Sequence, residues 1–204
     1  ELDHGELHAE ADAEIGDSGS ARDSGGGDLS LDAARAEPAR DQDAVRLGEE
    51  GQGFAICEKW LIEGRIPYAA GTIGVAQAAL QIAIDWAKER ETFRTKLADK
   101  QAIQWMIADS EMELRAARLL TWQAAWIADL GRGDLKVASS IAKVTATETA
   151  GRVVDRAIQI LGGLGVSQEL PLERWYREMR IKRIGEGPSE VHRMVLARQL
   201  LGNR

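Results

Sequence analysis

Cysteine and long apolar runs are scarce in this chain of 204 residues, which has one cysteine and four prolines. The single cysteine, Cys57, excludes an internal disulfide framework, and one Cys with three His disfavours a tetrahedral zinc site. A membrane-spanning helix needs about 20 consecutive apolar residues, and the acidic first residues do not resemble a signal peptide. We therefore expect a soluble cytoplasmic protein with no metal site.

The net charge of −7 combines two regions of opposite sign. Residues 1–53 contain 15 acidic residues against 4 Lys and Arg, whereas residues 54–204 contain 18 against 22. The mildly basic second region suits an anionic small ligand such as a nucleotide. Its excess of positive charge is too small to predict a nucleic-acid surface.

Residues 1–43 have no aromatic residue and include the stretch "SGSARDSGGGD". Such a composition cannot bury enough apolar surface to offset the entropy lost on ordering the chain. We predict a disordered acidic segment over residues 1–43, followed by one folded domain over residues 44–204. His4 and His8 in "HGELH" would share a helix face, but we expect no metal site in a disordered segment.

Helical periodicity dominates the folded region. Long helices are predicted over residues 68–90, about 100–130 and about 135–161, and shorter ones over about 172–180 and 189–201. No strand pattern of useful length is present. The positions predicted to be buried are Ile73, Ala76, Leu80, Ile84 and Ala87 in the first helix, Ile103, Met106, Ile107, Leu114 and Ala117 in the second, and Ala138, Ile141, Thr145, Val153 and Ile158 in the third.

Three long helices joined by short loops predict an all-α fold, an up-and-down helical bundle. The helices are longer than one small domain requires, so the apolar excess, including six Trp, is also available for subunit contacts. For each Trp, burial in the core is an equal alternative. Cys57 is interpreted as a small core or interface residue.

The stretch "RIGEGPSEVHR", residues 183–193, places one acid, Glu186, between two glycines. Gly187 is predicted to cap the next helix, with Pro188 in its first position and Glu190 in its first turn. The glycines allow the backbone to approach a ligand closely. A carboxyl group buried beside an apolar ligand has a raised pKa and can accept a proton. On local features alone, however, a solvated loop acid is the commoner role.

Four segments follow one another at characteristic spacing: "LGEEGQGF", "ERETFRTKLADKQAI", "AIQILGGLGV" and "ERWYREMRIKRIGEGPSEVHRMVLARQLL". Together they resemble the C-terminal helical domain of the acyl-CoA dehydrogenases over about residues 45–202. The resemblance implies an FAD enzyme of fatty acid metabolism that removes a proton and a hydride from an acyl-CoA thioester. It also implies an electron-transfer flavoprotein as the electron acceptor and a homo-oligomer, a dimer or a tetramer.

The resemblance assigns individual roles as well. Glu186 matches the family's catalytic base, which reverses the interpretation from local features. Arg90, Thr92 and Phe93 match a flavin segment in which the Arg reaches the pyrophosphate of FAD bound mainly by a neighbouring subunit. Without the resemblance, Arg90 would be a cation at a helix end. The remaining residues assigned to the flavin are Gln101, Gln159, Gly162 and Gly163.

Two further features complete these expectations. The "GGLG" stretch follows a helix and not a strand, so it is not a Rossmann fingerprint. His192 is expected to be a helix-surface or packing residue and not a catalyst. Three positions depart from the family pattern: Arg94 stands for a glycine, Gly185 for an aromatic residue before the base, and Pro188 for a Thr or Ser.

Residues 1–43 do not resemble the N-terminal helical domain or the middle β-domain of the family. We interpret the junction as a change of reading frame, an erroneous start or a truncated copy, and translation of the upstream DNA in the other two frames would test the first of these. The competing function is a non-catalytic helical oligomerisation module derived from the family. It predicts a colourless oligomer, whereas the enzyme predicts a flavin spectrum that bleaches with acyl-CoA.

Overall fold

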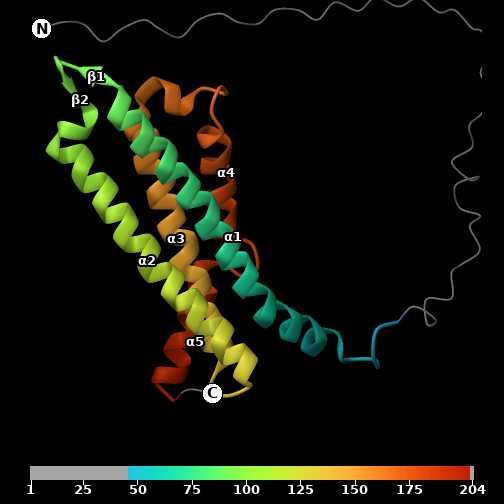
Figure 1. Ribbon diagram of the computed structural model, residues 1–204. Coiled ribbons are helices and arrows are strands. Elements are labelled where there is room, and N and C mark those ends of the chain that lie inside the picture. Colours follow the sequence, from blue (N-terminus) through green and yellow to red (C-terminus); the bar gives the residue numbers. More distant parts are fainter. Residues whose placement is uncertain (1–45, 203–204) are drawn as a thin grey trace, which may run out of the picture. The chain divides into compact units, whose positions relative to one another are not determined.

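The structure is a computed structural model, and it describes residues 46–202. The disordered segment predicted over residues 1–43 therefore lies outside the described residues. Five helices form most of the described chain, which confirms the all-α fold (Figure 1). They are α1 (Gly53–Glu89), α2 (Gln101–Leu130), α3 (Leu135–Leu161), α4 (Leu172–Lys182) and α5 (Ser189–Leu200), with short 3-10 helices η3 (Leu97–Asp99) and η4 (Gly162–Val166).

Helix α3 is the central element of the bundle, because it contacts α1, α2, α4 and α5. Its buried positions are mostly small, including Ala142, Ala146 and Ala150, and small side chains let neighbouring helices approach closely. Of the five positions predicted to be buried in this helix, Val153 is fully buried and the other four are half-buried, with Ala138 and Ile158 packed against the core. A helix covered from several sides has no single apolar stripe.

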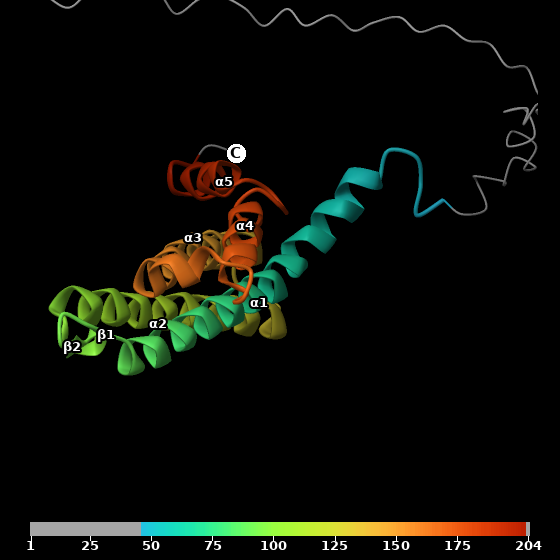
Figure 2. The same ribbon diagram turned by 90° about the horizontal axis from the view of Figure 1, so that it is seen from above.

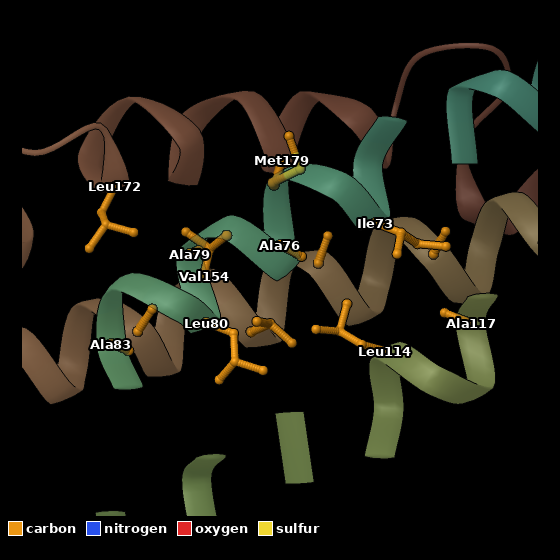
Figure 3. Close-up of a cluster of buried hydrophobic side chains, with 14 of the residues drawn as sticks. Ile73, Ala76, Ala79, Leu80, Ala83, Leu114, Ala117, Val154, Leu172 and Met179 are labelled. Atoms are coloured by element: carbon orange, nitrogen blue, oxygen red, sulfur yellow. The ribbon is translucent and has the colours of Figure 1, made fainter. Parts of the chain in front are cut away.

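The core lies where α1, α2 and α3 meet, and α4 closes one side of it (Figure 3). Ile73 and Leu80 of α1 pack near Leu114 of α2, while Leu172 and Met179 extend the core from α4. Each fully buried side chain of this size contributes about 1.5–3 kcal/mol. The stripe predicted for the first helix is confirmed, apart from a half-buried Ile84.

Helix α1 begins at Gly53, well before the predicted start near residue 68, and continues through Pro67. Figure 2 shows its first turns extending beyond the other helices, where Phe54 and Trp60 are exposed. These turns do not bury one face against the bundle, so their sequence carries no clear helical period. Pro67 removes one backbone hydrogen bond and lies on the exposed side of the helix.

A tight hairpin connects α1 to η3. Strands β1 (Glu91–Thr92) and β2 (Thr95–Lys96) pair antiparallel, Glu91 opposite Lys96 and Thr92 opposite Thr95. The turn residues Phe93 and Arg94 both have positive φ, 53° and 65°. Two positive φ values are the signature of the two-residue turn that matches strand twist. Strands of two residues are too short to give a periodic sequence signal.

The surface of α2 is unusually apolar. Trp105, Met112, Leu119 and Trp126 are 62% to 63% exposed and follow one another at seven-residue spacing. The core interpretation is wrong for these two Trp, and also for Trp60 and Trp122, which are exposed. Cys57 is exposed too, so it is not a core residue.

Every helix within residues 46–202 is too short or too polar to cross a bilayer.

Candidate functional site

Glu186 lies in the loop between α4 and α5, in a backbone conformation that is rare for a residue with a side chain. Its φ is +55°, and that of Gly187 is +99°. A Cβ on Gly185 would lie 2.7 Å from the hydroxyl of Tyr68, so the loop passes tightly against α1. The predicted cap is shifted by one residue: Pro188 is the N-cap and α5 begins at Ser189. Extended backbone at Pro188 (ψ 153°) accounts for the shift.

The carboxylate of Glu186 points inward. Its Oε2 atom is buried and has no hydrogen-bond partner among the residues that the structure describes. Gly64 of α1 faces this atom, since a Cβ there would lie 3.9 Å from Oε2. A buried carboxylate oxygen without a donor is uncommon and is typical of sites that act on a ligand.

Buried cations surround the carboxylate. Arg65 of α1 is 8% exposed, and its Nε and Nη1 atoms are buried without a hydrogen-bond partner in the described part of the chain. Burial lowers the pKa of Arg65, and the nearby charge of Glu186 opposes that change. Burial, followed by the charge of Glu186, raises the pKa of the Tyr68 hydroxyl. Arg65 and Tyr68 therefore face the acid from one helix.

Lys143 lies under the loop from α3. It is 0% exposed, and its Nζ donates to the carbonyl oxygens of Gly187 at 2.7 Å and Arg183 at 3.4 Å. Burial lowers the pKa of Lys143 to about 8, while the charge of Glu186 acts in the opposite direction. The ammonium group thus contacts both ends of the loop that carries the acid.

His192 supports the loop from α5. It is 1% exposed, which places it in the packing role that the sequence predicted. Its Nδ1 lies 3.1 Å from Ser140 Oγ, and that hydroxyl donates to the carbonyl of Lys136, so we assign the Nδ1 proton as the donor. Burial, followed by the charges of Arg65 and Lys143, lowers the pKa of His192 to about 4. The ring is therefore neutral near pH 7.

The residues assigned to the flavin gather at the other end of α1. A hollow of about 450 Å³ lies between the hairpin and η4. It contains five of the seven predicted residues: Arg90, Thr92, Gln159, Gly162 and Gly163. The other two do not line it. Phe93, 94% exposed, is at the tip of the hairpin, and Gln101 is exposed at the start of α2.

The chemistry of this hollow fits a flavin dinucleotide. Arg90 offers an exposed guanidinium, 5.8 Å from the ring centre of Trp86, and such a group can hold a pyrophosphate. Gly162 has a φ of +62°, and a Cβ on Gly163 would project into open space. Backbone along Gly162 and Gly163 is therefore accessible to a ligand, beside apolar walls from Trp86 and Leu97.

One chain does not bring the two groups of residues together. Gly64, which faces Glu186, and Arg90 are 26 residues apart on α1, or about 40 Å at a rise of roughly 1.5 Å per residue. Figure 1 shows the hairpin at one end of the bundle and α5 at the other. A single ligand cannot contact Arg90 and Glu186 of the same chain.

The sequence prediction missed the residues that support Glu186, namely Arg65, Tyr68 and Lys143. Lys143 had a usable signal, because it is the only charged residue in "ASSIAKVTAT" of a helix otherwise lined with small residues. Arg65 had none, since it lies on a turn of α1 that the prediction did not include. Tyr68 is the first residue of the predicted helix and stands outside its predicted buried stripe. Within residues 46–202, no three His, Cys, Asp or Glu side chains are grouped as metal ligands would be. His4 and His8 lie outside the described residues.

Comparison with known proteins identifies one family. The family described as "Acyl-CoA dehydrogenase, C-terminal domain" matches residues 51–201. The chain is 44% identical over 155 residues to the short-chain specific acyl-CoA dehydrogenase of Sus scrofa mitochondria, covering 76% of this chain and 38% of that protein. It is 45% identical over 156 residues to the caffeyl-CoA reductase-Etf complex subunit CarC of Acetobacterium woodii, covering 76% and 41%.

Solved structures give the same result. The butyryl-CoA dehydrogenase of Megasphaera elsdenii is similar with a TM-score of 0.73 and 42% identity, over 76% of this chain and 40% of that chain. The chain thus spans about two fifths of the length of the relatives that it matches.

Proposed function

Because the chain belongs to the acyl-CoA dehydrogenase family through its C-terminal domain, we propose that it supplies the base-bearing helical part of an FAD-dependent acyl-CoA dehydrogenase. The proposed reaction introduces a double bond between the α and β carbons of an acyl-CoA thioester. The observation that carries the proposal is the inward-facing carboxylate of Glu186, whose buried Oε2 has no hydrogen-bond donor within residues 46–202. A carboxylate held in this way can accept a proton from a substrate.

Glu186 would remove the α-proton. The electron pair of the broken α C–H bond forms the double bond, and the β-hydrogen leaves with its own electron pair. Bound FAD would accept that hydride. The buried cations Arg65 and Lys143 lie near enough to balance the charge of Glu186 before the transfer. The tight packing of Gly185 against Tyr68 holds the loop against α1.

Arg90, Gln159, Gly162 and Gly163 would hold FAD in the hollow beside the hairpin, and Arg90 would pair with its phosphates. These residues lie about 40 Å from the Glu186 loop of the same chain, so they would hold a flavin that serves Glu186 of another chain. This separation supports assembly of at least two chains, each contributing one half of a site. The name of the Acetobacterium woodii relative supports an electron-transfer flavoprotein as partner.

Replacement of Glu186 tests the proposed chemistry. The purified chain is supplied with FAD and then with butyryl-CoA, and bleaching of the flavin absorbance is followed. Glu186→Gln preserves the shape of the side chain but cannot take the proton, so we expect flavin reduction to slow by about 100-fold or more. Glu178→Gln, which changes an exposed acid on α4 that pairs with Arg174, is the matched control and should react at the wild-type rate. Equal rates for Glu186→Gln and wild type would refute the assignment.

A second function, oligomerisation without catalysis, is favoured by the apolar stripe of α2. Trp105, Met112, Leu119 and Trp126 repeat every seven residues, which is the spacing of helices that pair along a seam. Sedimentation of Leu119→Glu against Arg115→Glu, an exposed change one turn away, tests this surface. A colourless wild-type oligomer that dissociates only in Leu119→Glu would support the module in place of the enzyme.

A further inference from the structure

Lys143 lies directly beneath the α4–α5 loop that carries Glu186. The proposed reaction assigns it no proton or hydride transfer. Lys143 is fully buried in the middle of α3, and its ammonium group reaches the carbonyl oxygens of Arg183 and Gly187. These two carbonyls stand before and after Glu186 in the chain. We propose that Lys143 is the positioning residue of the site: by tying the two ends of the loop together, it fixes the conformation in which Glu186 faces inward.

The loop needs such a support because its backbone is unfavourable on its own. Glu186 has a positive φ, which places its Cβ too close to the following carbonyl. Pro188 has no N–H, and no side chain caps the start of α5. The backbone closes the loop with one hydrogen bond, from the amide of Ser189 to the carbonyl of Arg183 at 3.2 Å. Lys143 donates to that same carbonyl and so reinforces the closure.

A structural filler would be apolar at this place. Burial of an ammonium group is unfavourable unless the charge is paired, and apolar residues of similar volume are often neutral or stabilising in its place. Lys143 has no direct salt bridge within the described residues, only two neutral carbonyl acceptors and nearby charges. The hydrogen bonds from Lys143 to the loop carbonyls of Arg183 and Gly187 account for a lysine at this position. Within the described residues, the charged or titratable groups that act on it from the surrounding elements are Arg65, Glu148, Glu186, Glu190 and His192.

Because an apolar residue would stabilise this position but could not hold the loop, replacing Lys143 should loosen the loop without lowering the thermal stability. Lys143→Met keeps the length of the side chain but removes the donor and the charge. We expect amides 183–192 to exchange with deuterium at least about tenfold faster than in the wild type, while the thermal midpoint stays equal or rises. Amides in the core of α1 and α2 should keep their wild-type exchange.

Lys136→Met is the matched control, because Lys136 lies two turns earlier on α3 and pairs on the surface with Glu58 at 2.6 Å. It should leave exchange of the loop unchanged. Lys143→Gln keeps a neutral donor, and we expect loop exchange between those of wild type and Lys143→Met. Wild-type loop exchange in Lys143→Met would overturn the proposal. So would a lowered midpoint with faster exchange along the whole chain, because that is the behaviour of a general core residue.

The role of Lys143 in catalysis rests on the proposed function, whereas its role in holding the loop does not. The two proposals can therefore fail separately. Deuterium incorporation at the α-carbon of butyryl-CoA in D2O, with FAD present, reports on the base itself. If Glu186→Gln retains this exchange, the proposed function fails. If Glu186→Gln loses it but Lys143→Met keeps the wild-type rate, the proposed function stands and the positioning role of Lys143 fails. We expect Lys143→Met to slow this exchange by about tenfold.

Discussion

The two ends of α1 present half-sites of opposite character. At one end, Glu186 lies over a buried layer of charged and polar groups from α1, α3 and α5, in a strained loop. At the other, Arg90 and the glycines of η4 line an open hollow, and the Arg90 side chain is exposed. Contacts within the chain fix the geometry of the first region, whereas the second is open. The proposed base needs an exact position, and the proposed cofactor surface needs access.

Acid pH should disturb the Glu186 end first. The pKa of His192 in the folded chain is about 4, below its ordinary value of 6.5, because burial disfavours the charged ring. A lowered folded pKa gives stability that is complete above pH 6.5 and is lost as pH falls through 4. We expect wild type to lose of order 3 kcal/mol over this window relative to His192→Gln, measured by urea unfolding at several pH values. Parallel pH curves for the two proteins would contradict this expectation.

Adding one methyl group at each end should affect the two half-sites differently. A Cβ on Gly187 would lie 3.1 Å from His192 Nε2, at a φ of +99°. Gly187→Ala should therefore lower the unfolding free energy by about 2 kcal/mol. Gly163→Ala introduces a Cβ that meets nothing within 4 Å, so its stability should change by less than about 0.5 kcal/mol.

FAD binding should respond to the Gly163 change that leaves stability unaltered. Gly163 lines the hollow and a Cβ there meets no other atom, so a methyl group would occupy space open to a ligand. FAD affinity, measured by fluorescence titration, should therefore fall in Gly163→Ala although stability does not. Equal stability losses in Gly187→Ala and Gly163→Ala would mean that the two ends do not differ in preorganisation.

Arg90 provides a test confined to the open end. Arg90→Met removes an exposed guanidinium whose contact within residues 46–202 is with the ring of Trp86, so the unfolding free energy should fall by no more than about 1 kcal/mol. Loss of a phosphate contact should weaken FAD binding by about tenfold, or roughly 1.4 kcal/mol. Lys88→Met, which removes a positive charge in the last turn of α1 but not from the hollow, is the control. An equal loss of affinity in both variants would indicate a general charge effect.

The sequence predicts most of the fold because most of it is local. The bounds of α3 are as predicted, and those of α2, α4 and α5 agree within about two residues, since Gly131 and Gly162 end helices in a way that the sequence shows. The turns of α1 before Tyr68 were missed because the first of them project from the bundle and their sequence shows no regular apolar stripe.

The site is less predictable for a related reason. Glu186 stands in a recognisable motif, whereas Arg65 and Lys143 reach it from two other helices. Their convergence depends on how α1 and α3 pack, which no local pattern specifies. The family departure at Gly185 also becomes clear only in three dimensions: Tyr68 of α1 lies where a side chain at position 185 would be.

The smallest expected effect concerns the hairpin, where a substitution measures the backbone strain at the open end. Arg94 has a φ of +65°, the left-handed conformation that glycine adopts readily. It also stands where the family usually has glycine. Arg94→Gly removes the steric strain but makes the unfolded chain more flexible, so the net gain in unfolding free energy should be only about 0.5–1 kcal/mol. Arg94→Ala keeps the Cβ and the strain, and should show no gain in urea unfolding. If both variants gained equally, removal of the Arg94 charge, and not relief of backbone strain, would be the cause.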